Sequence, residues 1–326
     1  MLAIGVKERQ FELSNNRILY KLTWKDISDK LYEEFGVRIS ADYIRHEHYA
    51  LQSYKEVVEQ GIFTKILVLS DQHYPFTVSL NFLSQYKGKV DILVINGDEQ
   101  DCQAISKYPK YYREPFMKEL IGTRRMLIKT IEMVEPKKVI FTKGNHNTRF
   151  IRYFASNLDP DILSLLPETN LDLIVNDGFY DYDHKNKVKV YYEPLCSVFK
   201  DTEIVYNGEW YEQVGQTVFA HPEAYKGGIM ATAEKCSQYF NQIGLEYDTI
   251  VLGHTHQIGF TPIGNKYLFE SGCLCKGMTY RDGKLTKPQM NGYLYLMQDE
   301  EGKLLFDKSK IKLLGGYNEE VLCNNQ

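Results

Sequence analysis

The chain has 326 residues, of which 43% are hydrophobic and 25% are charged, and it carries a formal net charge of −4 with a pI near 6.1. This composition is typical of a globular protein long enough for a catalytic domain and a small accessory one. The slightly acidic balance excludes a general electrostatic attraction to nucleic acid or anionic membranes, so any DNA binding must come from local patches.

Neither a targeting segment nor a disulfide framework is indicated. Residues 1–9 lack a hydrophobic stretch of signal-peptide length, and no segment approaches the length of a transmembrane helix. The default expectation is a cytoplasmic enzyme without membrane contact. The six cysteines are spread along the chain. Cys273 and Cys275 alternate along a predicted strand, but no second such pair completes a zinc site, so both are interpreted as unpaired thiols.

Residues 1–62 differ in character from the rest and predict a small helical domain with two short helices. Thr23 is a candidate N-cap. The apolar residues that follow it are spaced three or four apart, as on one helix face: Trp24, Ile27, Leu31 and Phe35. Gly36 ends this helix, and Ser40 is a candidate N-cap for a second helix over 41–49. Two short helices joined by a tight turn predict a helix-turn-helix-like domain, with the second as its recognition helix.

Charge gives this domain two alternative interpretations. Residues 1–60 contain nine Lys and Arg against ten Asp and Glu, whereas most DNA-reading modules are basic. Four basic or titratable side chains nevertheless gather near the second helix: Arg38, Arg45, His46 and His48. The domain is therefore either a nucleic-acid-binding module or a unit for protein docking or dimerisation.

From residue 63 onward, five apolar runs end in residues of the types that bind metals. In chain order the runs lead to Asp71 and His73, to Gly97 and Asp98, to Gly144, Asn145 and His146, to His221, and to Gly253, His254 and His256. Such runs are typical of buried parallel strands, and open α/β sheets place their chemistry beyond the carboxyl ends of these strands. The repetition at the same end of every run predicts one shared site.

The segments between these runs indicate crossover helices. Glu114–Pro115 begins a helix whose apolar residues continue at helical spacing to Val134. A second helical pattern covers 229–243, and the part between about 157 and 211 is less regular.

The C-terminal part predicts further strands, which cover 266–270, 292–297 and 303–306, with a hairpin turn at 299–302. A second sheet packed on the first would bury the apolar faces of both. The predicted fold class of 63–326 is α/β, a layered β-sandwich flanked by helices.

Seven side chains after these runs are candidate metal ligands: Asp71, His73, Asp98, Asn145, His221, His254 and His256. They offer oxygen and imidazole donors without a thiolate, which suits Mn²⁺, Fe²⁺ or Zn²⁺. Seven donors are too many for one tetrahedral ion, but they suit two ions that share a carboxylate, with solvent in the remaining positions. Two ions roughly 3.5–4 Å apart can bind a bridging hydroxide as nucleophile and clamp the oxygens of a phosphate.

In order and spacing, the five motifs resemble those of the calcineurin-like metallophosphoesterase superfamily over about residues 64–275. The resemblance implies a metal-dependent phosphoric ester hydrolase with the metallophosphoesterase fold and two divalent ions, Mn²⁺ foremost and Fe²⁺ or Zn²⁺ as alternatives. It assigns the first ion to Asp71, His73, Asp98 and His256. It assigns the second ion to Asp98, Asn145, His221 and His254, with Asp98 bridging.

The resemblance also implies catalytic residues beside the bridging Asp98. His146 would stabilise the phosphate oxygens or protonate the leaving group. Family members often have Asp or Glu in the next position, where this chain has Asn147, so weaker electrostatic support for a protonated His146 is expected. Arg149 and Arg152 follow on a predicted helix start, and Arg149 is the candidate phosphate ligand. The alternative for both arginines is a solvated helix face.

The substrate class is open between two hypotheses. A basic and aromatic cluster follows Asp98 and could stack bases, form a lid or contact a second copy: Lys107, Tyr108, Lys110, Tyr111, Tyr112 and Arg113. The first hypothesis is a nuclease or DNA phosphodiesterase, with a domain similar to the nuclease domain of double-strand-break repair exonucleases. The second is a phosphatase or phosphodiesterase for a small molecule, nucleotide or phosphoprotein, with 1–62 as a docking unit.

The combination of helix-turn-helix-like start and catalytic domain also resembles metallophosphoesterases of bacteriophages and prophages, which favours nucleic-acid metabolism by analogy. The oligomeric state is left open by the sequence.

Overall fold

The computed structural model of the chain describes residues 4–49, 63–108, 112–277 and 289–315. The chain divides into two units, Met1–Phe63 and Thr64–Gln326, and each is described by itself. None of the described helices combines the length and hydrophobicity needed to cross a bilayer.

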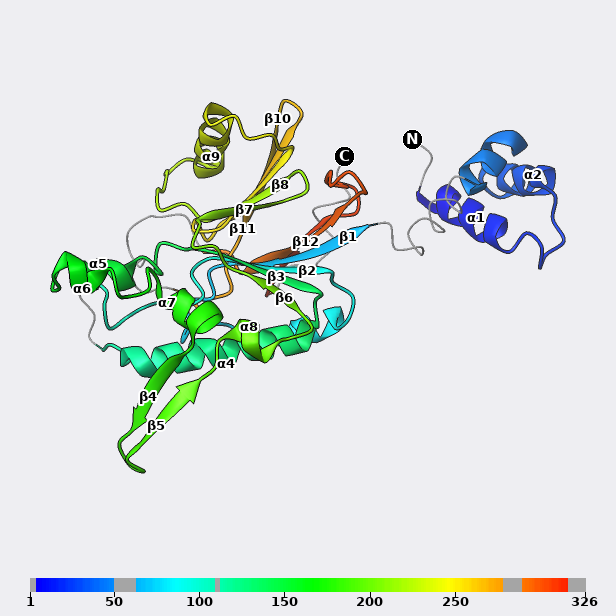
Figure 1. Ribbon diagram of the computed structural model, residues 1–326. Coiled ribbons are helices and arrows are strands. Elements are labelled where there is room, and N and C mark those ends of the chain that lie inside the picture. The colour runs from blue at the N-terminus through cyan, green and yellow to red at the C-terminus, as the bar shows by residue number, and fades with distance from the viewer. Residues whose placement is uncertain (1–3, 50–62, 109–111, 278–288, 316–326) are drawn as a thin grey trace. The chain divides into compact units, whose positions relative to one another are not determined.

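The first unit contains α1 (Ile4–Asn15), α2 (Trp24–Phe35) and a further helix over 41–49 (Figure 1). Thr23 caps α2, because its hydroxyl accepts from the Asp26 N–H while the Asp26 carboxylate accepts from the Thr23 N–H. Gly36 ends α2 with a left-handed φ of 69°, and the Ser40 hydroxyl accepts from the Tyr43 N–H at 3.2 Å. These predicted helix ends are confirmed, whereas α1 was not predicted.

The three helices enclose a small hydrophobic core. Its buried residues come from all three helices and the turn between the last two: Val6, Leu13, Ile27, Leu31, Ile39 and Ile44. Arg9 of α1 also forms an ion pair with Glu34 of α2 at 2.8 Å. The first unit therefore has its own apolar interior, in which α1 supplies the surface that α2 alone could not cover.

Two mixed sheets form the centre of the second unit (Figure 1). The first has the order β13-β12-β1-β2-β3-β6: Lys310–Leu313, Gly292–Gln298, Thr64–Leu69, Ile92–Asn96, Lys138–Thr142 and Glu203–Val205. The second has the order β10-β11-β9-β8-β7: Ile258–Ile263, Lys266–Ser271, Thr249–Leu252, Thr217–Ala220 and Tyr211–Val214. Strands β1, β2, β3 and β6 are parallel, as are β8, β9 and β11.

Both faces of the central strands are buried, which explains their continuous apolar sequences. In β1, Ile66 and Val68 join the apolar layer between the sheets, with Phe219 and Val251 of the second sheet. Leu67 and its neighbour Leu69 point to the opposite face and pack against the helical layer. The layered sandwich flanked by helices is therefore confirmed.

Helices cover the outer face of each sheet (Figure 1). Against the first lie α4 (Phe116–Val134) and the 3₁₀ helix η1 (Asn81–Tyr86), and against the second lies α9 (Ala231–Gln242). The predicted crossover helices are confirmed. The less regular part contains α5 (Arg149–Ala155), α6 (Pro160–Leu163), α7 (Asn170–Asp172), the π-helical η2 (Leu173–Asp177), the hairpin β4–β5 (Phe179–Asp183, Val188–Tyr192) and α8 (Leu195–Val198).

The predicted strand over 303–306 is wrong. The turn before it is present, since the Gly302 N–H donates to the Asp299 carbonyl at 3.0 Å. Beyond the turn, only Leu304 forms a β-bridge, to Gln298, and the chain turns again where the Lys308 N–H donates to the Leu305 carbonyl at 3.1 Å. Of the segments that follow β12 in the chain, the one that pairs with it as a strand is β13.

Candidate metal centre

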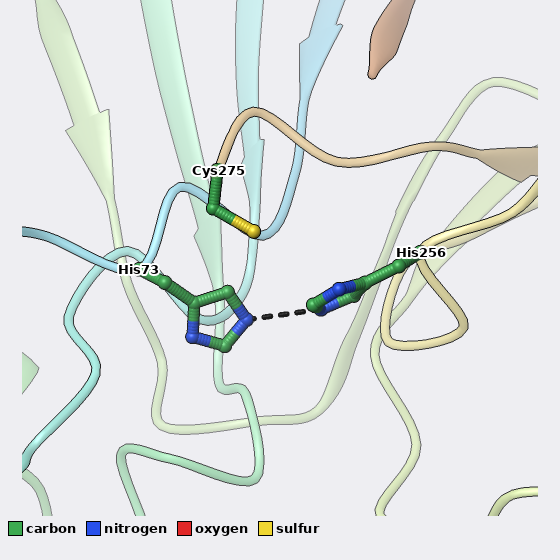
Figure 2. A group of neighbouring side chains, drawn as sticks. All are labelled: His73, His256 and Cys275. Carbon is green, nitrogen blue, oxygen red and sulfur yellow. Dashed lines mark hydrogen bonds between the residues drawn. The ribbon is translucent and has the colours of Figure 1, made fainter. Parts of the chain in front are cut away.

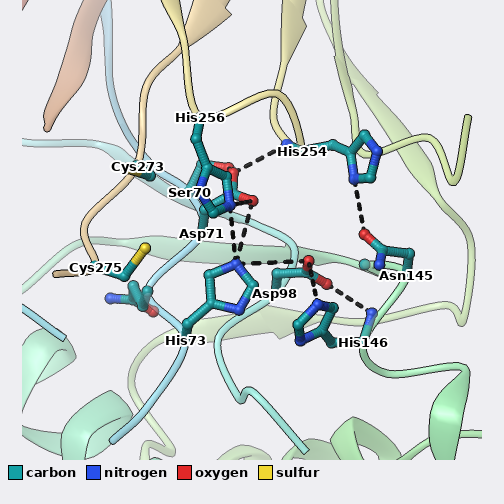
Figure 3. A network of polar contacts seen from close by, with 12 residues as sticks. Ser70, Asp71, His73, Asp98, Asn145, His146, His254, His256, Cys273 and Cys275 are labelled. Carbon is teal, nitrogen blue, oxygen red and sulfur yellow. Dashed lines mark hydrogen bonds and ion pairs between the residues drawn. The ribbon is translucent and has the colours of Figure 1, made fainter. Parts of the chain in front are cut away.

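The polar side chains that follow five strands meet in one place. Asp71 and His73 follow β1, Asp98 follows β2, Asn145 and His146 follow β3, His221 follows β8, and His254 and His256 follow β9. Because β1, β2 and β3 are parallel to one another, as are β8 and β9, their carboxyl ends lie at one edge of each sheet. Figure 3 shows all of these side chains except that of His221 gathered in one place, and His221 lies 3.3 Å from Asp98. The structure brings all seven predicted ligands together.

One half of the centre contains His73, His256 and Asp71. The two imidazole Nε2 atoms are 3.0 Å apart (Figure 2). The His256 Nε2 atom lies 3.0 Å from Asp71 Oδ1, and the His73 Nε2 atom lies 3.6 Å from the same oxygen. His73 Nε2 is also 3.8 Å from Asp98 Oδ2. This half matches the set assigned to a first ion.

The other half contains His221, His254 and Asn145. His221 Nε2 lies 3.3 Å from Asp98 Oδ2, and the ring of His254 meets the amide oxygen of Asn145 at 2.8 Å (Figure 3). The backbone N–H of His254 donates to Asp71 Oδ2 at 2.9 Å. Asp98 lies within 4 Å of histidines from both halves, as a shared ligand would. Asp71 also reaches both halves, since its Oδ1 lies 3.9 Å from His221 Nε2.

The donors fit divalent ions. Asp71 and His221 are 0% exposed, and among the described residues Asp71 Oδ1 and His221 Nε2 make no hydrogen bond. Their nearest polar neighbours are other candidate ligands, His256 for Asp71 and Asp98 for His221, and burying such atoms without hydrogen bonds of good geometry is costly. A cation bound between carboxylate and imidazole donors would offset this cost, and the donor types suit Mn²⁺, Fe²⁺ or Zn²⁺.

The histidines differ in pKa. Burial lowers the pKa of His73, but the carboxylates of Asp101 and Asp71 outweigh it and raise the pKa to about 10. His221 behaves similarly beside Asp98 and Asp71, with a pKa raised to about 9. Burial, together with His221, lowers the pKa of His254 to about 4. In the protein without metal, His73 and His221 therefore carry protons at neutral pH.

The backbone at the centre is unusual, since five of the seven candidate ligands have a left-handed φ. The values are 53° for Asp71, 45° for His73, 52° for Asp98, 75° for His254 and 55° for His256. Side chains other than glycine rarely adopt this region, and such strain concentrates at functional sites. The strand ends therefore turn sharply to bring these side chains inward.

The glycines that precede three of the ligands are required by close packing. A Cβ on Gly97 would collide with the ring of His221, and one on Gly144 would collide with Asp98. A Cβ on Gly253 would meet the Ser70 hydroxyl and the His221 ring. The motifs Gly-Asp, Gly-Asn-His and Gly-His thus have a steric origin.

His146 lies beside the centre and is held by two neighbours. Its Nδ1 is 3.0 Å from the carbonyl oxygen and 3.3 Å from the carboxylate of Asp101, and its Nε2 is 2.6 Å from Arg149 Nη2. A guanidinium can only donate, so Nε2 accepts this bond and Nδ1 carries the proton. Burial lowers the pKa of His146 to about 4, although Asp98 opposes the shift.

Asp101 was missed by the sequence reasoning. It contacts His146 and also lies 3.6 Å from His73 Nδ1. Asn147, which occupies the position where family members often have Asp or Glu, accepts from the Gly144 N–H and donates to Glu99. Asp101 therefore places a carboxylate beside His146, and the signal was a third acidic residue in the run from Asp98.

The two predicted arginines after His146 point in different directions. Arg149 points toward the centre, whereas Arg152 forms an ion pair with Glu223 at 2.8 Å, in line with a helix-face position. Of the aromatic cluster, Tyr108 and Tyr112 are exposed, while Lys110 and Tyr111 lie outside the described residues.

A cavity of about 490 Å³ adjoins the centre at His221. It lies between the carboxyl end of β3 and α9, and its lining includes Lys143, Trp210, Lys226, Lys235 and Tyr239. Volumes of this size are typical of small-molecule sites. The cavity combines aromatic surface with cationic side chains beside the candidate ligands.

Some solved structures are similar to this chain at low sequence identity. No curated protein matches the chain. Similar solved structures include Vps29 from Entamoeba histolytica complexed with Zn²⁺, with 12% identity, a TM-score of 0.39, and coverage of 77% of this chain and 98% of that chain. An archaeal phosphodiesterase is also similar, with 14% identity, a TM-score of 0.32, and coverage of 77% and 100%.

The model of the calcineurin-like phosphoesterase family matches residues 64–258, which include all seven candidate ligands. Because this match covers more than half of the chain, the chain belongs to the calcineurin-like phosphoesterase family and is a metal-dependent phosphoester hydrolase.

Proposed function

We propose that this hydrolase is a nuclease or DNA phosphodiesterase that binds two divalent ions, Mn²⁺ foremost, at the seven-donor centre. That centre is defined as Asp71, His73, Asp98, Asn145, His221, His254 and His256. The observation that carries the reaction class is the convergence of these donors from five strand ends. When bound, two such ions generate a nucleophile from water at neutral pH and stabilise the charge on the phosphate oxygens.

His146 and Arg149 act on the substrate in this proposal. Arg149 presently donates to His146 Nε2 at 2.6 Å and to the Asp101 carbonyl at 2.7 Å. A substrate phosphate offers the guanidinium stronger acceptors. As Arg149 turns to the phosphate, Nε2 of His146 becomes available to hold a proton for the leaving oxygen. Asp101 then orients the ring through Nδ1.

Exposed aromatic rings support a nucleic-acid substrate. Tyr108 is 58% exposed and Tyr112 is 65% exposed. They lie a few residues beyond Asp101, and the Lys107 ammonium lies 5.5 Å from the Tyr108 ring centre. Rings of this kind stack on bases, while neighbouring cations attract the phosphates.

The first unit supports the same proposal as a helix-turn-helix-like DNA-binding domain over residues 1–62, with 63–326 as the catalytic domain. On the predicted recognition helix and the turn before it, Arg38, Arg45 and His46 are exposed. His48 is buried, and its ring packs 5.1 Å from that of Trp24. The surface that the domain could offer to DNA is therefore that of Arg38, Arg45 and His46.

A second candidate function is a phosphodiesterase or phosphatase for a small molecule such as a nucleotide. The cavity beside His221 favours it, because its volume of about 490 Å³ suits one small ligand. Lys143, Lys226 and Lys235 would attract an anionic substrate, and Trp210 would offer a ring to a base. In this case the first unit would serve for docking.

The deciding experiment compares four substrates in the presence of Mn²⁺: labelled single-stranded DNA, labelled double-stranded DNA, an aryl phosphodiester and an aryl phosphomonoester. Asp98→Asn is the inactive control, because it weakens the shared ligand without changing the shape of the side chain. We expect DNA cleavage by the unaltered protein, and loss of both activity and bound metal in the variant. Unchanged metal content and turnover in Asp98→Asn would refute the two-ion centre.

The pattern of substrates separates the two candidate functions. DNA cleavage that is absent from Asp98→Asn supports the nuclease. Hydrolysis of the aryl esters with untouched DNA refutes the nuclease and leaves the second candidate, which a nucleotide substrate series would then define.

A further inference from the structure

Cys275 lies beside the histidines of the first half of the centre, although the sequence predicted no thiol ligand. Its Sγ and one ring nitrogen each of His73 and His256 all lie within 4.8 Å of one another. Figure 2 shows the sulfur beside the gap between the two imidazoles. These two histidines are the ones proposed to bind the first ion, so the sulfur lies within reach of the same ion.

The backbone fixes this position. The Leu274 N–H donates to the Ser70 carbonyl at 3.1 Å, and the Lys276 N–H donates to the Phe76 carbonyl at 2.8 Å. Cys275 also forms a β-bridge with Thr77. The segment with Cys275 is thus bonded on both sides to the loop that carries Asp71 and His73. The sulfur is placed by the same framework as the predicted ligands.

Without a metal, the hydrogen bond with Cys273, burial and the carboxylate of Asp71 raise the pKa of the Cys275 thiol, so a bound cation is what would hold the sulfur as a thiolate. Cys275 and Asp71 are 0% exposed and His73 is 1% exposed. The side-chain amide of Gln289 donates to Cys275 Sγ at 3.2 Å, and a donor on the sulfur is typical of the contacts that support metal ligands.

Cys273 differs in position, because its Sγ lies 3.4 Å from the Met290 carbonyl oxygen, whereas the Sγ of Cys275 lies with the two imidazoles. The two thiols also share a hydrogen bond with each other.

We propose that Cys275 is a thiolate ligand of the first ion, together with Asp71, His73, Asp98 and His256. As the sulfur–metal bond forms, the thiol proton leaves to solvent. A thiolate is a soft donor that favours Zn²⁺, Co²⁺ or Fe²⁺, whereas Mn²⁺ prefers carboxylate and water. The first site would therefore select a softer ion than the second, whose donors are imidazole and oxygen. This inference rests on the proposed metal centre.

Titration of the full-length protein with Co²⁺ tests the inference without measuring turnover. Bound Co²⁺ gives ligand-field bands in the visible region, and a thiolate ligand adds a sulfur-to-cobalt charge-transfer band in the near ultraviolet. We expect both in the unaltered protein. Cys275→Ser should keep cobalt binding at the second site and lose the charge-transfer band. Cys273→Ser is the matched control and should keep the band.

X-ray absorption by the zinc-loaded, unaltered protein gives a measurement that depends on no variant. A thiolate ligand places a sulfur at about 2.3 Å, whereas nitrogen and oxygen ligands lie at about 2.0–2.2 Å. We also expect Cys275→Ser to weaken zinc binding at one site by at least about tenfold, since loss of a supporting contact alone costs about 10- to 100-fold. Manganese binding should change less.

The outcomes separate the thiolate from the centre itself. Three results would overturn the thiolate ligand and leave the metal centre intact. These are bound cobalt without a charge-transfer band, a charge-transfer band that persists in Cys275→Ser, and bound zinc with only nitrogen and oxygen neighbours. Failure of the unaltered protein to bind either ion would overturn both the centre and the inference.

Discussion

At the scale of single residues, His146 is held where it could act on a leaving group without binding a metal. Its ring contacts Asp101 and Arg149, while its backbone N–H donates to Asp98 Oδ1 at 2.8 Å. These contacts support the proposed role of the side chain in proton transfer rather than in metal binding. Replacing the ring leaves the backbone bond to Asp98 in place.

We predict that His146→Ala retains its metal but slows hydrolysis by about 10²- to 10⁴-fold, the usual contribution of acid–base assistance. Metal analysis and single-turnover rates measure the two effects. His184→Ala is the control, because this histidine lies in the hairpin β4–β5 with its ring 5.0 Å from Tyr182. Loss of metal from His146→Ala would show that the residue is a ligand instead.

The pKa values of His73 and His221 predict that metal uptake depends on pH. Both are raised, to about 10 and about 9, so each histidine is protonated at pH 7 in the protein without metal. Only the neutral imidazole binds a metal, so binding releases these protons. Apparent affinity should rise about tenfold per pH unit for each proton released between pH 7 and 9.

The same shifts affect the metal-free fold in the opposite direction. Raised histidine pKa values stabilise it fully below about pH 6.5, the unfolded value, and this contribution is lost as pH rises through 9 to 10. For metal uptake, calorimetry in two buffers of different ionisation enthalpy counts the protons that metal binding releases. A metal affinity that stays constant from pH 7 to 9 would contradict the predicted rise.

At the scale of elements, the turn after β2 depends on a glycine. Gly97 has a φ of 75°, and a Cβ there would collide with the His221 ring. Gly88, before the same strand, has a φ of 66°, but a Cβ there would meet nothing within 4 Å. Both glycines have a left-handed backbone, but only at Gly97 would an added Cβ collide with another side chain.

We predict that Gly97→Ala lowers metal content and activity, whereas Gly88→Ala keeps both. Each substitution costs about 1–2 kcal/mol for a side chain in the left-handed region. Only Gly97→Ala would also displace His221. Thermal unfolding measures the loss of stability expected in both variants, and metal analysis measures the loss of metal expected in Gly97→Ala alone. Equal metal loss in both variants would refute the steric argument.

The five strands that lead to the centre, and the gathering of the seven candidate ligands at their ends, could be predicted from the sequence because local signals mark them. Runs buried on both faces are continuously apolar, and parallel strands bring their carboxyl ends together without further information. Two further neighbours of the centre could not be predicted in this way. Asp101 reaches His146 through a loop, and Cys275 reaches His73 through pairing between residues some 200 positions apart in the chain.

Two errors in the expected elements have similar causes. The helix α1 has few apolar residues, of which Val6 and Leu13 are buried against α2, so its periodicity is weak. The segment 303–306 contains apolar residues because Leu304 packs in the layer between the two sheets, and not because it forms a strand. Both features depend on tertiary contacts that a local pattern does not contain.

At the scale of the whole molecule, each unit has a separate hydrophobic core. Among the residues that the structure describes, the buried residues of the first core lie between Val6 and Ile44, and those of the second unit begin at Ile66. All seven candidate ligands belong to the second unit. Catalysis on a small ester should therefore not require the first unit.

We predict that a chain lacking residues 1–62 hydrolyses an aryl phosphodiester as the full-length protein does, but cleaves DNA more weakly, since the exposed Arg38, Arg45 and His46 are removed. Leu31→Ala in the full-length protein is the companion variant. This fully buried leucine should cost the first unit about 2–5 kcal/mol and leave ester hydrolysis unchanged. Loss of ester hydrolysis in both proteins would mean that the first unit supports the catalytic fold. Equal DNA cleavage by the shortened and full-length proteins would instead make the first unit a docking module.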